Sequence, residues 1–191
     1  MQGPAGALAR FHSESLVRWL LVAILAYMSV VAEMLLFRPG VLAVQVDGHW
    51  ARPDLVLVLG VFLALALEAH ETFIVGWCLG LASDLVAVAG RLGVGALLFA
   101  VVLYVVGLFR KTVVGGRVPA QFLLCFGACF AVHWAWYVAT RHLEAAPLWV
   151  WRSAEEAALD ALYSAFLAPY LFWGLARLRG PLGLAPAATA E

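Results

Sequence analysis

Charged residues are scarce in this sequence. Only 13% of its 191 residues are Asp, Glu, Lys or Arg, whereas 65% are hydrophobic. A soluble domain of ordinary composition is about 25% charged and about 45–50% apolar, so this chain lacks the polar surface that a water-soluble domain needs. Because the twelve basic and twelve acidic residues give a formal net charge of +0, no surface for nucleic acid is indicated.

Cysteines are few, and familiar catalytic motifs are missing. Cys78, Cys125 and Cys129 all lie within apolar runs, which argues against the disulfide framework of a secreted protein. The sequence has no P-loop, Rossmann fingerprint, HExxH, GxSxG or CxxC, and no hydrophilic segment is long enough to form a separate domain. No cleavable signal peptide is expected, because the first apolar run has about 22 residues, the length of a membrane span.

What the sequence has in abundance is long apolar runs, bounded by charges, glycine and proline. They predict an all-α polytopic membrane protein, a six-transmembrane-helix bundle. The predicted spans are 16–37, 55–67, 72–89, 93–109, 119–140 and 155–176. Residues 68–71 and 90–93 are predicted as tight turns. The expected organisation is a cytoplasmic N-terminal segment (1–15), a transmembrane domain (16–179) and a cytoplasmic disordered tail (180–191).

Basic residues at the ends of the runs indicate the orientation. Arg110, Lys111 and Arg117 form one cluster, and Arg177 and Arg179 form another. Since cytoplasmic loops are enriched in lysine and arginine close to span ends, both termini are predicted to be cytoplasmic. On the opposite, outer side, a tryptophan pair fits an interfacial aromatic anchor: Trp149 and Trp151.

Three acidic residues, Glu33, Asp84 and Asp160, lie inside or near the ends of these runs. A carboxylate at the bilayer centre costs at least about 2.5–3.5 kcal/mol, so each needs a reason to be there. The predicted topology places all three in the outer half of the membrane, near a set of basic residues: Arg52, Arg91 and Arg152. The acids are predicted to form a shared polar cluster that holds helices or a partner; alternatively, each caps a neighbouring helix or reaches the interface. Catalysis is not favoured, because no nucleophile or metal partner stands at a fixed spacing.

Cys125, Cys129 and His133 are spaced four residues apart and are predicted to share one face of a helix. Thiolate and imidazole ligands at this spacing could begin a zinc site. One helix supplies an incomplete set of ligands, however, and no other Cys–His pair completes it. Buried cysteines beside a hydrogen-bonded histidine are the favoured interpretation, and neither a metal nor a cofactor is expected.

Small residues mark where helices are expected to pack closely. Gly76 and Gly80 form a GxxxG pattern, and Asp84 continues the same stripe. Pro169 removes a helix hydrogen bond and allows a kink in the last run. That run carries two adjacent stripes: Ala157, Ala161 and Ala165, and beside them Asp160, Ser164 and Ala168.

Three segments in order carry a family resemblance. Arg52-Pro53-Asp54-Leu55 opens the second run, Gly76 to Leu85 is followed by Gly90 and Leu92-Gly93, and 162–169 ends with Pro169. Together they resemble the MreD family, the rod shape-determining membrane proteins of the bacterial elongation machinery. Asp160 and Ser164 stand where many members carry an asparagine. The candidate structural or partner-binding residues are Arg52, Pro53, Asp54, Gly76, Gly80, Asp84, Gly90, Gly93, Asp160, Ser164 and Pro169.

The resemblance implies a non-enzymatic scaffold of the bacterial inner membrane that helps maintain rod cell shape. Its implied partners are an MreC-like protein, an MreB-like actin homologue, a RodA-like transglycosylase and a class B penicillin-binding protein. It also implies a fold similar to the substrate-binding subunits of energy-coupling-factor transporters, and a small-molecule-binding subunit of that kind is the alternative function. Those subunits usually dock their coupling partner through Ala-xxx-Ala on the first helix, whereas the first run here has Ala23, Ala26 and Ala32 and no such pair.

Overall fold

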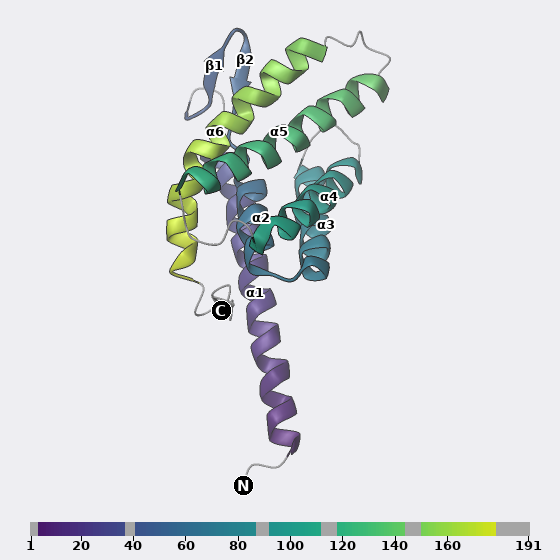
Figure 1. The fold of residues 1–191 in the computed structure, drawn as a ribbon, viewed down its shortest axis with the longest axis vertical. Coiled ribbons are helices and arrows are strands. Elements are labelled where there is room, and N and C mark those ends of the chain that lie inside the picture. The colour runs from purple at the N-terminus through teal and green to yellow at the C-terminus, as the bar shows by residue number, and fades with distance from the viewer. Residues whose placement is uncertain (1–3, 37–40, 87–91, 112–117, 144–149, 179–191) are drawn as a thin grey trace.

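The residues that the computed structural model describes form six α-helices and one small β-hairpin (Figure 1). These residues are 4–36, 41–86, 92–111, 118–143 and 150–178. In chain order the elements are α1 (Pro4–Leu36), β1 (Val44–Val46), β2 (His49–Ala51), α2 (Leu55–Ala66), α3 (Ala69–Val86), α4 (Val94–Leu108), a 3₁₀ turn η1 (Phe109–Lys111), α5 (Val118–Leu143) and α6 (Val150–Ala176). The protein is an all-α polytopic membrane protein.

Three of the helices contain segments long and apolar enough to cross a membrane. These segments are Val17–Leu36 in α1, Val118–Thr140 in α5 and Trp151–Ala176 in α6. The apolar helices α2 and α4 are shorter. The 12 residues of α2 extend roughly 18 Å, less than the hydrocarbon core of about 30 Å. The prediction that all six helices cross the membrane therefore stays a prediction.

The core is built around α2. Nearly every residue of this helix is buried, including Val56, Leu57 and Val58, each 0% exposed. A helix that is hydrophobic on every side is stable only when it is surrounded, and α2 packs against α1, α3, α4, α5 and α6. Large apolar side chains such as Leu20 and Leu97 point outwards instead. The protein thus has an apolar exterior suited to lipid.

One helix begins earlier than its predicted span, and one predicted turn is absent. Helix α1 begins at Pro4, while its apolar segment begins at Val17, so the domain boundary predicted at residue 16 stays a prediction. Residues 68–71 are not a separate polar turn, because α3 begins at Ala69. A carboxylate oxygen of Glu71 accepts the N–H of Glu68 at 3.5 Å, which is one of the two contacts of a capping box at a helix start. The predicted tail, 180–191, lies outside the described residues.

A β-hairpin replaces the mixed loop expected after the first span. β1 and β2 pair antiparallel, with Val44 opposite Ala51 and Val46 opposite His49. Asp47 and Gly48 form the two-residue turn, and both have positive φ, 49° and 84°. Positive φ at both central residues is what a two-residue hairpin turn of type I′ requires, and Asp-Gly is a preferred pair for it. The hairpin stands where α1 ends and α2 begins, at the end of the molecule opposite the N-terminal part of α1 (Figure 1).

Candidate functional site

Two carboxylates converge on the N-terminus of α2. The first N–H groups of a helix have no partner within it, and α2 begins inside the protein. Oδ1 of Asp54, the N-cap residue, accepts the N–H of Leu57 at 2.7 Å. Oε1 of Glu33, from α1, accepts the N–H of Val56 at 2.8 Å. Both carboxyl groups accept N–H groups of the first turn of α2, so Glu33 is explained by the helix end that it satisfies.

Asp160, on α6, connects the hairpin to the helices. Its side chain is 7% exposed. Oδ1 accepts the backbone N–H of Arg52 at 3.0 Å and lies 3.1 Å from Nε2 of His49. Oδ2 accepts the hydroxyl of Tyr137, on α5, at 3.0 Å. One buried carboxylate therefore joins α5, α6 and the end of β2.

Ser164 and His133 extend these contacts towards α2. The Ser164 hydroxyl donates to the carbonyl of Asp160 at 2.7 Å and accepts the backbone N–H of Asp54 at 2.9 Å. Nε2 of His133 lies 3.4 Å from Oδ2 of Asp54, an ion-pair distance without hydrogen-bond geometry, and its Nδ1 lies 4.0 Å from Asp160. We call the whole set the polar network: Glu33, His49, the Arg52 backbone, Asp54, His133, Tyr137, Asp160 and Ser164.

Asp84 lies apart from this network, so the predicted shared cluster of three acids is wrong for Asp84. Its Oδ2 accepts the N–H groups of Gly93 at 2.8 Å and Ala96 at 3.2 Å, at the start of α4. The physical reason is local: the short connection after α3 brings the unsatisfied first turn of α4 next to the end of α3. Arg152 does not join the network through its side chain either, since it pairs with Glu156 at 3.3 Å. Arg91 lies outside the described residues.

The glycines of α3 are covered by α4. A Cβ on Gly80 would lie 2.6 Å from Cα of Ala96, and one on Gly76 would lie 2.9 Å from Cα of Ala100. The close helix packing expected at this GxxxG pattern is therefore formed with α4, whose backbone fills the stripe. A Cβ on Gly95 would collide with the Asp84 carboxylate.

Gly93 is the N-cap of α4 and has a φ of 104°, a conformation that favours glycine. Gly90 lies outside the described residues.

The sequence matches the family of the rod shape-determining protein MreD over residues 13–175. The chain belongs to the MreD family. The match includes every residue of the polar network. Members of this family are membrane proteins that determine rod shape and are generally not enzymes. No significant match was found among curated proteins, and none among solved structures.

In this MreD-family chain, the helix face that carries Cys125, Cys129 and His133 lies in two different environments. Cys125 and Cys129 are both 0% exposed within the apolar core, whereas His133 lies between the carboxylates of Asp54 and Asp160. Across the part of the chain that the structure describes, no three His, Cys, Asp or Glu residues are grouped so that they could hold a metal ion.

Of the remaining predicted residues, Pro53 is buried directly before the N-cap of α2, while the Arg52 side chain is exposed. Ser164 is 0% exposed. Pro169 lies inside α6, which changes direction along its length (Figure 1).

Two members of the polar network in this MreD-family protein, His49 and Tyr137, were not predicted. Signals for both were present in the sequence. Asp47-Gly48 between alternating apolar residues indicates a hairpin, which would have set His49 at its second strand. Tyr137 follows His133 by four residues and so continues the face that Cys125, Cys129 and His133 define.

Proposed function

We propose that this protein is a non-enzymatic scaffold of the bacterial cell-wall elongation machinery, which binds an MreC-like partner in the inner membrane and helps maintain rod shape. The observation that carries the proposal is that the carboxylates inside or near the ends of the apolar runs all bind backbone groups. Glu33, Asp84 and Asp160 all accept backbone N–H groups. Such contacts fix helix ends and a hairpin in place. This rigidity supports the proposal that the protein acts by presenting a surface to a partner.

The surface that we propose for the partner is the hairpin and its surroundings, within segments 38–53 and 141–154. Val44 and Trp50, on the hairpin, are 51% and 37% exposed, and Trp151, at the start of α6, is 84% exposed. Tryptophan is enriched among the residues that dominate binding at protein interfaces. Asp160 holds this hairpin against α6, so the proposed surface is preorganised, which lowers the entropic cost of binding.

The arrangement in the membrane is part of the same proposal. Six helices cross, both termini are cytoplasmic together with 1–15 and 180–191, and the hairpin faces the periplasm. Support comes from the basic residues near the opposite end, such as Arg18 and Arg110. Directly or through the MreC-like protein, the scaffold meets the MreB-like protein, the RodA-like transglycosylase and the class B penicillin-binding protein. The similarity to energy-coupling-factor substrate-binding subunits remains a prediction about the fold.

Co-purification with the MreC-like protein from detergent tests the proposal directly. Trp50→Ala is expected to weaken binding about thirtyfold, because truncating an interface hot spot costs about 2 kcal/mol. Trp77→Ala is the matched control, since Trp77 lies on α3 with a similar exposure of 42%, and it is expected to bind as the unaltered protein does. A monodisperse protein that ignores the MreC-like partner and binds a vitamin tightly would favour the transporter subunit instead.

A further inference from the structure

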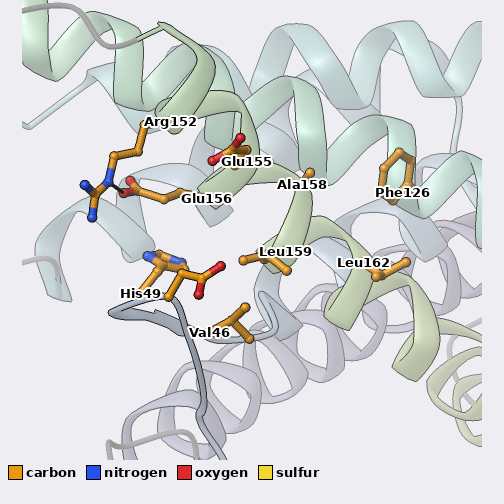
Figure 2. A pocket seen from close by; sticks show the side chains of 10 residues that line it. Val46, His49, Phe126, Arg152, Glu155, Glu156, Ala158, Leu159 and Leu162 are labelled. Carbon is orange, nitrogen blue, oxygen red and sulfur yellow. Dashed lines mark hydrogen bonds and ion pairs between the residues drawn. The ribbon is translucent and has the colours of Figure 1, made fainter.

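A groove of about 660 Å³ is lined by residues of the hairpin, α5 and α6, among them His49 of the polar network (Figure 2). One end is polar, with Arg152 and Glu156 facing His49. The other end is apolar, with Leu162 and Phe126 (Figure 2). The volume falls in the range of about 300–1,000 Å³ that is typical of small-ligand pockets.

Exposed tryptophans beside the groove indicate that its two ends lie at different depths in the membrane. Trp151 is 84% exposed and directly precedes Arg152, and Trp50 is exposed on the hairpin. Tryptophan side chains gather at the level of lipid headgroups, which places the polar end of the groove at that level. From Glu155 to Leu162 the axis of α6 advances roughly 10 Å. The apolar end therefore reaches into the hydrocarbon region on the hairpin side of the bilayer.

Negative charge prevails among the residues that line the groove. Its charged lining residues are Asp47, Glu155 and Glu156 against Arg152. The guanidinium of Arg152 pairs with Glu156 at 3.3 Å, which leaves the carboxylates of Asp47 and Glu155 in excess. An ammonium group balances this excess negative charge and donates charge-assisted hydrogen bonds to the carboxylates. The remaining N–H donors of Arg152 suit a phosphate.

We propose that this groove binds a phospholipid whose zwitterionic headgroup carries a primary amine. The ammonium lies between Asp47 and Glu155, the phosphate lies at Arg152, and an acyl chain follows Leu159 and Leu162 towards Phe126. His49 lines the same groove and contacts Asp160, so the bound lipid touches the hairpin's attachment to α6. The proposal does not depend on the scaffold function, because lipid binding is measured without any protein partner.

Native mass spectrometry of the full chain in detergent tests the headgroup. The purified protein is titrated with phosphatidylethanolamine, phosphatidylcholine and phosphatidylglycerol of identical acyl chains. Phosphatidylethanolamine is expected to bind best, because choline lacks N–H donors and glycerol lacks the positive charge. Glu155→Lys, at an exposed position, is expected to weaken phosphatidylethanolamine binding about tenfold, the effect of losing a hydrogen bond to a charged group. Glu68→Lys, at a site whose side chain is 70% exposed on the α2–α3 connection, is the matched control and leaves binding unchanged.

A second pair of variants tests the acyl end. Leu159→Trp fills the groove and is expected to abolish the retained lipid, whereas Leu97→Trp changes a leucine that is 52% exposed on α4 and is expected to have no effect. Equal affinity for the three headgroups, or lipid retained in Leu159→Trp, overturns the proposal. If Leu159→Trp keeps its lipid but no longer recovers the MreC-like protein, the groove is a protein-docking site and the lipid proposal is equally overturned.

Discussion

Single carboxylates in this protein act mainly on the backbone of a neighbouring helix. Asp84 accepts two N–H groups at the start of α4, and Glu33 accepts one at the start of α2. In an apolar environment an N–H without an acceptor costs several kcal/mol. An acidic residue within an apolar run is energetically unfavourable by itself. Here it offsets a larger cost, which is that of leaving the N–H groups in the first turn of a buried helix without acceptors.

Asp84 offers a graded test of this explanation. Asp84→Leu leaves the N–H groups of Gly93 and Ala96 without their acceptor, and we expect the free energy of unfolding to fall by about 3 kcal/mol. Asp84→Asn keeps one carbonyl oxygen as an acceptor and loses only the charge, so we expect a loss of about 1 kcal/mol. Unfolding in detergent, followed by tryptophan fluorescence, measures both. Equal losses in the two variants would contradict the capping role.

Gly80 provides a second prediction at the same scale. In Gly80→Ala the new methyl group would lie 2.6 Å from Cα of Ala96 and 2.7 Å from the carbonyl oxygen of Gly95. Because backbone atoms cannot move aside as a side chain can, α3 and α4 must separate, and we expect a loss of about 2 kcal/mol. Gly127→Ala is the control, since nothing lies within 4 Å of a Cβ at that position. Thermal unfolding should leave that variant unchanged or slightly more stable.

At the scale of elements, the hairpin depends on Asp160 of α6. Asp160→Ala removes the acceptor for the Arg52 N–H and for His49. We expect backbone amides of 44–52 to exchange with deuterium about tenfold faster, since a hydrogen bond to a charged group contributes at least about 1.5 kcal/mol. Exchange measured by mass spectrometry in detergent resolves the hairpin from α2.

Ser153 supplies the control for that experiment. It lies on the same helix as Asp160 and is 1% exposed, and its hydroxyl has no hydrogen-bond partner among the described residues. Ser153→Ala should therefore leave hairpin exchange as it is. Unchanged exchange in Asp160→Ala would show that the hairpin is held by other contacts.

The elements themselves follow from local signals, whereas the network between them does not. Asp54 before an apolar run marks the start of α2, and Gly93 marks the start of α4, so both helices could be predicted. The contacts of Asp160 join residues 108 and 111 positions apart, and no local pattern specifies which helix end an acid will meet. Asp84 shows the consequence: its burial followed from the GxxxG stripe, but its partner did not.

Across the whole molecule, polar contacts gather at two ends and leave an apolar band between them. The polar network occupies the hairpin end. At the other end, near the α2–α3 connection, Arg18 pairs with Glu71 at 2.6 Å, and Arg110 donates to the carbonyl of Leu67 at 2.7 Å. The residues between these levels are apolar outside as well as inside. This distribution is what a bilayer requires of a protein that spans it.

The orientation of these two ends can be measured by cysteine accessibility. Gln45→Cys places a thiol on the exposed side of β1, and His70→Cys places one at the opposite end, where the native side chain is 72% exposed. Each is made in a Cys78→Ala background, because Cys78 is exposed whereas Cys125 and Cys129 are buried.

With Arg18 and Arg110 on the side of His70, the positive-inside rule assigns that end to the cytoplasm. A membrane-impermeant maleimide should therefore label Gln45→Cys in intact spheroplasts and His70→Cys only after the membrane is permeabilised. Labelling of both variants after permeabilisation controls for thiol reactivity. The reverse pattern would invert the orientation. Labelling of both from outside would mean that α2, the shortest and most buried helix, does not separate the two sides of the membrane.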